Sequence, residues 1–311
     1  MTVPGPFVPG LAIGHGHAYG ARTGCTVFLG PFRAAVEVRG LATGSRELGV
    51  LDPQHLVPCV DAILLTGGSA FGLAAADGVM SWLAEKGRGY DAGVARVPIV
   101  PAAVIFDLQP HATRPDSETG VAACEDAREG WPVEGRVGAG AGATVGKIAG
   151  PEGAMPGGIG AWATDLGSHR MGAVAVVNAL GDVLDAGGAI VAGARAPDGS
   201  FLDTASVLRS GGTGPGEMRF MVAGASTTLA VVATDAPLSR VDLGRVARVA
   251  SNALARRISP VHTPFDGDVV FAVSTAAEAR DVSSAEVLAL SACAQHALEE
   301  AITRAVTEGH R

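Results

Sequence analysis

Two short segments in the second half of the chain carry residue types that nucleophilic chemistry uses. Ser226 and Thr227 stand where a glycine-rich stretch gives way to TTLAVVATD, a run typical of a buried strand. Asp266 and Asp268 lie one residue apart just before another short strand. A hydroxyl needs an adjacent base to act as a nucleophile. Taken alone, however, a threonine at a strand start is ordinary β-propensity, and two aspartates in a turn usually do no chemistry.

A second candidate is the glycine-rich stretch 136–150, which contains Lys147, one of only two lysines in the chain. A phosphate-binding loop needs a glycine five positions before the Gly-Lys pair and a Ser or Thr after it. Here Ala141 and Ile148 occupy those positions. The run that starts at Gly138 fits a looser dinucleotide fingerprint, but a poor strand precedes it and no clear helix follows. Nicotinamide binding therefore stays a weak alternative.

Two further patterns match active-site motifs only in part. The turn around Ser69 suggests a nucleophile elbow, G-x-S-x-G, but Phe71 stands in place of the last glycine. We therefore expect Ser69 to cap a helix. His15 and His17 could bind a metal ion, yet no convincing third ligand lies nearby. The simpler interpretation is that they are ordinary loop histidines near the N-terminus, and we expect no metal site.

Composition narrows the class of protein. The chain has 311 residues, a net charge of −8 and no run of basic residues, which argues against nucleic acid as a partner. Four widely spaced cysteines favour neither a zinc site nor a disulfide framework. The first ten residues lack the pattern of a signal peptide, and the longest apolar stretch, 97–106, is too short to span a bilayer. We expect a cytoplasmic protein that has no membrane partner.

The periodicity of apolar residues predicts strands and helices in mixed order, and hence an α/β or α+β fold with a covered sheet. Its 44 glycines and 5% aromatic residues suggest closely packed backbones. We predict strands over 61–66, 171–177, 227–235 and 269–273, and helices over 69–86, 239–258 and 285–307. The last helix follows a capping box formed by Ser283 and Glu286. Residues 194–226 are expected to form a long exposed loop.

Seven blocks of the sequence occur in the same order in one protein family: 24–27, 61–83, 97–108, 140–147, 174–183, 227–238 and 260–273. On these blocks the chain resembles the self-processing L-aminopeptidase/D-esterases, a family that includes β-peptidyl aminopeptidases and nylon-oligomer endohydrolases. The resemblance covers nearly the whole chain. It implies one hydrolase domain over 1–311 with a four-layer α/β/β/α sandwich, which is similar to N-terminal-nucleophile hydrolases but has a different strand connectivity.

The resemblance also implies a precursor that cuts its own backbone before Thr227. Cleavage would leave an α chain of 1–226 and a β chain of 227–311, and the freed amine of Thr227 would serve as its own base. An α-amino group has a pKa of about 7.7–8.0, near the operating pH. Many Thr-type members have asparagine before the cut, whereas this chain has Ser226. Ser226 is also a rival nucleophile, with cleavage after Ala225.

Four further roles follow from the same resemblance. Asn178 matches an asparagine that donates a hydrogen bond to the oxyanion. Lys147 matches a lysine near the nucleophile, whose charge would lower the pKa of the amine and stabilise developing negative charge. Asp266 and Asp268 match the pair that orients the nucleophile and its amine, and this pair is typical of the Thr-type branch.

We therefore expect a self-cleaving N-terminal-threonine amidohydrolase or aminopeptidase. It would act on small peptides, amides or esters through an acyl-enzyme on Thr227, without a metal or organic cofactor. The active form would be a homotetramer of cleaved αβ units. One alternative is an uncleaved or slowly processed relative that acts on another amide, such as a ring-opened lactam or a pantetheine-like compound. The other is a non-catalytic small-molecule binding protein that keeps the fold.

Overall fold

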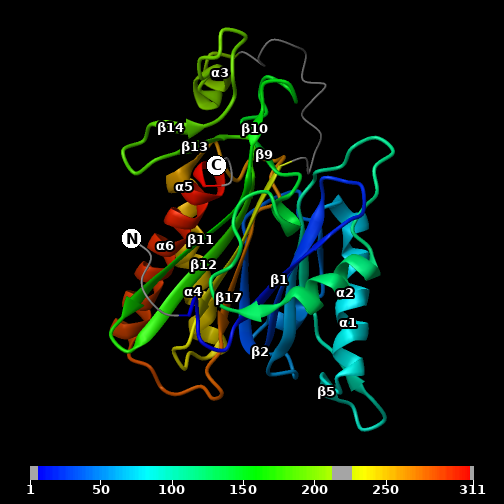
Figure 1. The fold of residues 1–311 in the computed structure, drawn as a ribbon. Coiled ribbons are helices and arrows are strands. Elements are labelled where there is room, and N and C mark those ends of the chain that lie inside the picture. Colours follow the sequence, from blue (N-terminus) through cyan, green and yellow to red (C-terminus); the bar gives the residue numbers. More distant parts are fainter. Residues whose placement is uncertain (1–5, 212–225, 309–311) are drawn as a thin grey trace.

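The computed structural model describes residues 6–211 and 226–308. Within these residues, ten strands form one hydrogen-bonded sheet (Figure 1). Eight of them follow the order β11 (Gly158–Leu166), β12 (His169–Asn178), β15 (Thr227–Thr234), β17 (Val269–Ser274), β2 (Gly24–Val38), β4 (Val60–Thr66), β7 (Ala102–Val104) and β3 (Ser45–Arg46). The other two are β1 (Ala12–His17), which pairs with β2, and β8 (Arg128–Glu129), which pairs with β1.

Shorter elements surround this sheet. In the described part of the chain, three small sheets are formed by β5 (Tyr90–Asp91) with β6 (Arg96–Val97), by β9 (Thr144–Val145) with β10 (Met155–Pro156), and by β13 (Asp182–Leu184) with β14 (Ile190–Ala192) and β16 (Ile258–Ser259). The α-helices are α1 (Ala75–Glu85), α2 (Ser117–Asp126), α3 (Thr204–Arg209), α4 (Arg240–Ala250), α5 (Asn252–Arg257) and α6 (Ser284–Thr307). The 3₁₀ helices are η1 (Leu48–Leu51), η2 (Ser69–Ala74) and η3 (Gly138–Gly140).

The long strand β2 belongs to both halves of the large sheet. Its residues 24–32 pair with β1 and β4, whereas its residues 33–38 pair with β17. The register to β4 shifts between Leu29 and Phe32, and such irregularities bend a strand. The sheet is therefore divided into a half around β4 and a half around β15.

Three hydrophobic clusters separate four layers. The central cluster joins the inner faces of the two halves, with Phe28 and Ile63 from one and Val231 and Phe271 from the other. A second cluster lies between the β15 half and helices α4, α5 and α6, and a third lies between the β4 half and helices α1 and α2. Figure 1 shows these two groups of helices on opposite sides of the strands. The predicted four-layer α/β/β/α architecture is confirmed.

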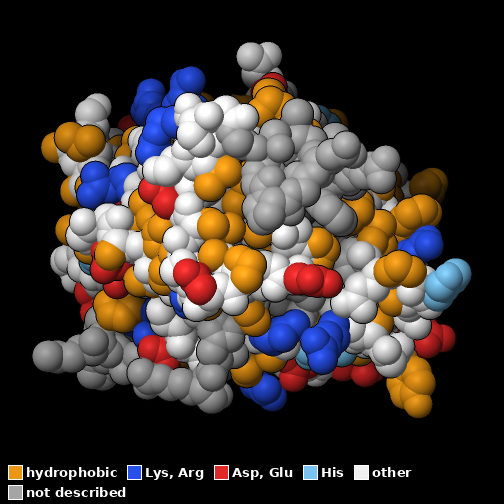
Figure 2. All heavy atoms as spheres, turned by 90° about the horizontal axis from the view of Figure 1, so that it is seen from above, with side chains coloured by type: hydrophobic (Ala, Val, Ile, Leu, Met, Phe, Trp, Pro, Cys, Tyr) orange, Lys and Arg blue, Asp and Glu red, His pale blue; other side chains and the backbone are white. Residues whose placement is uncertain are grey.

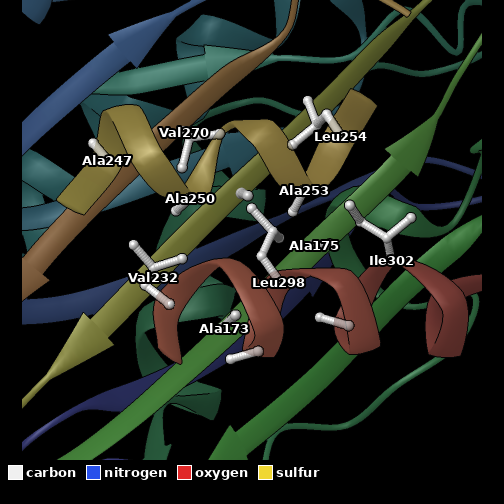
Figure 3. Packing of buried hydrophobic residues seen from close by; sticks show 14 of the residues in the cluster. Ala173, Ala175, Val232, Ala247, Ala250, Ala253, Leu254, Val270, Leu298 and Ile302 are labelled. Atoms are coloured by element: carbon white, nitrogen blue, oxygen red, sulfur yellow. The ribbon is translucent and has the colours of Figure 1, made fainter. Parts of the chain in front are cut away.

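Small side chains line the interface between the β15 half and its helices. Figure 3 shows alanines from both sides of this interface, with larger side chains between them: Ala173, Ala175, Ala250, Ala253, Val232, Leu254, Leu298 and Ile302. All of these residues are buried. Alanine adds little bulk, so the backbones of helix and strand approach closely, as the composition suggested.

Most elements predicted from periodicity are confirmed as β4, β12, β15, β17 and α6. The Ser283 side chain accepts a hydrogen bond from Glu286 N at 3.2 Å and starts α6. The helix predicted over 239–258 is divided at Ser251. The buried Ser251 hydroxyl donates to Arg248 O at 2.8 Å, and a side chain that bonds its own backbone competes with helix continuation.

Two local predictions were wrong. Ser69 does not cap a helix with its side chain, because residues 69–74 form η2 and Ser69 itself has φ +51°. The expected loop over 194–226 contains helix α3, which starts because the Asp203 side chain accepts from Ser206 N at 3.1 Å. Residues 212–225 of that loop lie outside the described residues. In the part of the chain that is described, no helix is long and apolar enough to cross a membrane.

Candidate active site

The topology of the β15 half brings the predicted site residues to one edge of the sheet. β15 and β17 run parallel, so Thr227 at the start of β15 lies at the same edge as the two aspartates that precede β17. β12 runs antiparallel to β15, and its last residue, Asn178, pairs directly with Thr227. Residues opposite each other on neighbouring strands have side chains within contact distance.

The hydroxyl of Thr227 lies against the peptide bond that precedes it. Thr227 is buried, and its Oγ1 donates a hydrogen bond to Ser226 O at 2.6 Å. The same carbonyl oxygen accepts from Gly267 N at 2.9 Å. A Cβ at Gly267 would lie 2.7 Å from Thr227 Oγ1, so only glycine leaves room for the hydroxyl here.

The two aspartates are buried and are held mainly by backbone donors. Asp268 Oδ1 accepts from Thr228 N at 2.7 Å, and Asp266 Oδ2 accepts from Thr263 N at 2.7 Å. Burial raises the pKa of Asp266, and the nearby charge of Asp268 raises it further. The second carboxylate therefore makes it harder for the first to ionise.

Lys147 and Asn178 form a polar pair beside this edge. Lys147 Nζ donates to the main-chain oxygen of Asn178 at 3.0 Å and to its Oδ1 at 2.9 Å. Asn178 Nδ2 in turn donates to Phe106 O at 3.2 Å. Burial lowers the pKa of Lys147 to about 7, although the negative charges of Asp266 and Asp107 act in the opposite direction.

The glycine-rich stretch 136–150 delivers Lys147 to the site. Gly146 N and Lys147 N donate to the carbonyl oxygens of Gly181 and Leu180, at 3.0 and 2.9 Å. Gly146 has φ +69°, and a Cβ there would lie 2.0 Å from Ala194 N. The stretch does not form the strand-to-helix turn of a dinucleotide site, because the run from Gly138 forms η3 and then leads into β9.

Two residues that the sequence did not single out also reach the site. Asp107 follows the residue whose carbonyl Asn178 contacts, and its charge acts on Lys147. Its Oδ1 accepts from Gly68 N at 2.6 Å, and burial raises its pKa. His262 Nδ1 lies 2.8 Å from Asp268 Oδ2. Both residues lie in sequence blocks that the chain shares with the family. The sequence could not show that Asp107 lies near Lys147 or that His262 contacts Asp268.

The two N-terminal histidines both lie in strand β1, where they pair with β2, rather than in a loop. His15 Nδ1 contacts Thr26 Oγ1 at 3.0 Å, and burial lowers the pKa of His15 to about 4. His17 is exposed at the end of β1. Among residues 6–211 and 226–308, no group of three or more His, Cys, Asp or Glu side chains is arranged to hold a metal ion.

The arrangement gathers the parts that acyl transfer requires. A hydroxyl faces a carbonyl, a backbone N–H donates to that carbonyl oxygen, and an amide, an amine and two carboxyl groups lie around them. Figure 2 looks down on the end of the molecule where β9 and β10 lie. On that face, acidic and basic side chains stand in small separate groups among hydrophobic and neutral ones (Figure 2).

Comparison with known proteins identifies the family of the chain. The family model described as peptidase family S58 matches residues 7–311. The chain is 41% identical over 290 residues to an uncharacterised aminopeptidase of Mycobacterium leprae, covering 87% of this chain and 78% of that protein. It is 34% identical over 279 residues to the 6-aminohexanoate-oligomer endohydrolase of Kocuria sp., covering 86% and 73%.

Solved structures show the same fold at lower identity. A β-aminopeptidase of Burkholderia sp. matches with a TM-score of 0.69 and 23% identity over 98% of this chain and 88% of that chain. The L-aminopeptidase D-Ala-esterase/amidase of Ochrobactrum anthropi, described as a new variant of the Ntn-hydrolase fold, matches with a TM-score of 0.70 and 19% identity, covering 98% and 87%. The family resemblance noted in the sequence is confirmed: the chain belongs to peptidase family S58 and is a hydrolase.

Proposed function

We propose that the chain is a self-cleaving amidohydrolase whose nucleophile is Thr227, first in cutting its own backbone and then in cutting substrates. The observation that carries the proposal is the 2.6 Å contact between Thr227 Oγ1 and Ser226 O. It holds the hydroxyl beside the peptide group that would be cut. Thr227, Asn178 and the two aspartates also share one buried edge of the sheet, and Lys147 contacts Asn178 from the neighbouring loop.

Self-cleavage would proceed as an N-to-O acyl shift. Thr227 Oγ1 attacks the carbonyl carbon of Ser226, the C–N bond breaks, and the hydroxyl proton passes to the departing nitrogen of Thr227. The product is an ester between Ser226 and Thr227. Water then hydrolyses this ester, leaving a carboxylate on Ser226 and a free amine and hydroxyl on Thr227. Negative charge develops on Ser226 O during the attack, and the N–H of Gly267 already donates to that atom at 2.9 Å.

Serine in place of asparagine before the cut is compatible with this step. The two contacts that hold the scissile carbonyl use the main-chain oxygen of Ser226, not its side chain. The rival cleavage, after Ala225 with Ser226 as nucleophile, involves a residue outside the described part of the chain. We propose Thr227 because its hydroxyl contacts the carbonyl of the residue before it.

Turnover of a substrate would reuse the same hydroxyl. The freed amine of Thr227 takes the proton from Oγ1, which attacks the substrate carbonyl. The leaving amine or alcohol departs with a proton, and water then releases the acid. We propose that Asn178 Nδ2 donates to the substrate oxyanion, that Lys147 stabilises developing negative charge, and that Asp266 and Asp268 orient Thr227. The substrates would be small peptides, amides or esters, as the names of the relatives suggest.

Trapping the acyl-enzyme tests this function. The purified protein is mixed with p-nitroanilide and p-nitrophenyl ester derivatives of small amino acids, quenched in acid and analysed by peptide mass mapping. We expect release of the chromophore and an acyl adduct on Thr227. Turnover with the adduct on another residue, or no turnover of any amide or ester in a fully cleaved sample, would contradict the proposal. The second result would favour a binding protein.

A further inference from the structure

His262 is a partly exposed residue whose ring contacts Asp268, one of the two buried aspartates of the site. Its Nδ1 lies 2.8 Å from Asp268 Oδ2. The side chain of Asp268 is 2% exposed, whereas that of His262 is 25% exposed. An ionised carboxylate can only accept, so the hydrogen of this bond must be on Nδ1. His262 therefore donates to a carboxylate that solvent barely reaches.

Asp268 connects this histidine to the strand that carries the nucleophile. Its other oxygen, Oδ1, accepts from Thr228 N at 2.7 Å, one residue after Thr227. The main-chain oxygen of Asp268 also accepts from Arg39 N at 3.0 Å and Gly40 N at 3.1 Å. The backbone of Asp268 is thus fixed, and its carboxylate spans the gap between His262 and the start of β15.

The backbone of His262 is left-handed at the point where its ring makes this contact. Its φ is +54°, in the left-handed region that non-glycine residues rarely adopt. Such conformations persist where the surroundings hold them, and they cluster at functional sites. His262 is one of five described non-glycine residues with positive φ, and its ring reaches the site carboxylate.

We propose that His262 is a positioning residue of the hydrolytic site: it donates to Asp268, and Asp268 holds the start of β15 where Thr227 can attack. This inference rests on the proposed function of Thr227. His262 itself touches no reacting atom. Without it, Asp268 Oδ2 would lose its donor in a buried position close to Asp266, a second carboxyl group. A buried carboxylate without its partner is unfavourable, so the side chain of Asp268 would move.

Three substitutions separate the hydrogen bond from the backbone strain. His262→Gly removes the donor and relieves the left-handed backbone. His262→Asn keeps an N–H donor, and asparagine tolerates the left-handed region. His262→Ala removes the donor and keeps the strain. A matched control is His111→Gly, because His111 is exposed and also left-handed, with φ +58°.

We expect His262→Gly and His262→Ala to lower kcat by about 10- to 100-fold with little change in KM, as loss of a hydrogen bond to a charged group predicts. His262→Asn should retain most of the activity, and His111→Gly should match the wild type. Because the ring is a quarter exposed, the space it leaves in His262→Gly opens to solvent. Added imidazole should enter that space and restore kcat in a saturable way.

The decisive measurement is the imidazole dependence of kcat for the wild type, His262→Gly and Thr227→Ala. Selective restoration in His262→Gly supports the proposal, since a purely structural role would not respond to imidazole. Unchanged kcat in His262→Gly, or a loss that neither imidazole nor His262→Asn reduces, overturns it. If His262→Gly fails to cleave itself, the rate of chain cleavage is measured with and without imidazole instead of kcat. Restoration of cleavage by imidazole supports the proposal, and no restoration by imidazole or by His262→Asn overturns it. A wild type that is not cut at Thr227 refutes the proposed function instead.

Discussion

The two ends of strand β15 carry threonines that face different groups. At the start, Thr227 Oγ1 donates to the carbonyl oxygen of Ser226 at 2.6 Å. At the end, Thr234 Oγ1 accepts from Ala236 N at 3.1 Å. Both threonines are buried. One hydroxyl is thus directed at an electrophilic carbonyl, and the other completes a turn. What the hydroxyl faces, rather than the residue type, makes Thr227 the candidate nucleophile.

The acidic and histidine neighbours of β15 differ in the same way. Beside its start, Asp268 is 2% exposed and lies 2.8 Å from His262. After its end, Asp235 is 27% exposed and lies 3.5 Å from His169. Water screens the second pair, so its interaction is weak. In the first pair the carboxylate is buried, so breaking the pair leaves a buried carboxylate without this donor. We therefore expect equal substitutions at the two ends to have very unequal effects.

The largest contrast is expected between Thr227→Ala and Thr234→Ala. Thr227→Ala removes the nucleophile and should abolish both chain cleavage and turnover. Thr234→Ala removes only an acceptor for Ala236 N and should destabilise the fold by about 1–3 kcal/mol while leaving kcat unchanged. Denaturing mass spectrometry, initial rates and urea unfolding check these effects. Comparable loss of kcat in both variants would show that the contrast between the two ends is false.

Asn178→Ala should have the next largest effect. Loss of one oxyanion donor lowers kcat by about 10²–10³-fold. The same substitution also removes an acceptor of Lys147, so KM and kcat should be measured separately on protein already cut into two chains. A loss confined to KM would place Asn178 in substrate binding and not in stabilisation of the oxyanion.

The pH dependence of turnover tests the role of Lys147. Its pKa is lowered to about 7, so the ammonium group is present below about pH 7 and is lost as the pH rises through that value. If the positive charge stabilises the oxyanion, kcat/KM should fall at alkaline pH. The arginine of Lys147→Arg keeps its charge to above about pH 12. The fall of kcat/KM in this variant should therefore occur at a higher pH than in the wild type. If kcat/KM falls at the same alkaline pH in both proteins, loss of the Lys147 charge is not the cause of the fall.

A smaller effect, on stability, is expected from Gly146→Ala. Gly146 has φ +69°, and a Cβ would meet Ala194 N at 2.0 Å, whereas Gly188 has φ +86° and open space around it. Gly188→Ala should therefore lower the free energy of unfolding by only about 1–2 kcal/mol, the left-handed penalty. Gly146→Ala must add backbone displacement to that penalty and misplace Lys147. Equal unfolding midpoints in urea would refute the difference.

The smallest effect is expected from His169→Ala. This histidine, whose side chain is 26% exposed, faces Asp235 and Glu286 at 3.5 and 3.7 Å, and such pairs contribute about 0–1 kcal/mol. Its kcat should equal that of the wild type, in contrast to His262→Ala. A tenfold loss of kcat on substitution of His169 would mean that the far end of β15 also contributes to catalysis.

Sequence patterns predicted the long elements well because their apolar periodicity is strong. Strands β12, β15 and β17 and helix α6 were expected within a few residues, and the four-layer architecture followed from the family resemblance. Breaks in regular structure escaped prediction, because they depend on single contacts. The division at Ser251 arises from a hydroxyl bonded to its own backbone, and η2 begins at a left-handed residue, Ser69.

The site was predictable only in part for the same reason. Thr227 and Asn178 occupy conspicuous positions at strand ends, and the resemblance drew attention to them. Asp107 and His262 belong to the same blocks but matched no known role, and periodicity says nothing about which charge a loop residue will meet. His262 reaches Asp268 from a left-handed backbone, which a local sequence pattern does not specify.

The most direct test of the account is the mass of the purified chain under denaturing conditions, together with N-terminal sequencing of every fragment. We expect two chains, the smaller beginning Thr227-Thr228-Leu229, and one uncut chain of 31.1 kDa from Thr227→Ala. A single 31.1 kDa wild-type chain that still hydrolyses amides, or two chains from Thr227→Ala, would contradict the assignment of Thr227 as the nucleophile.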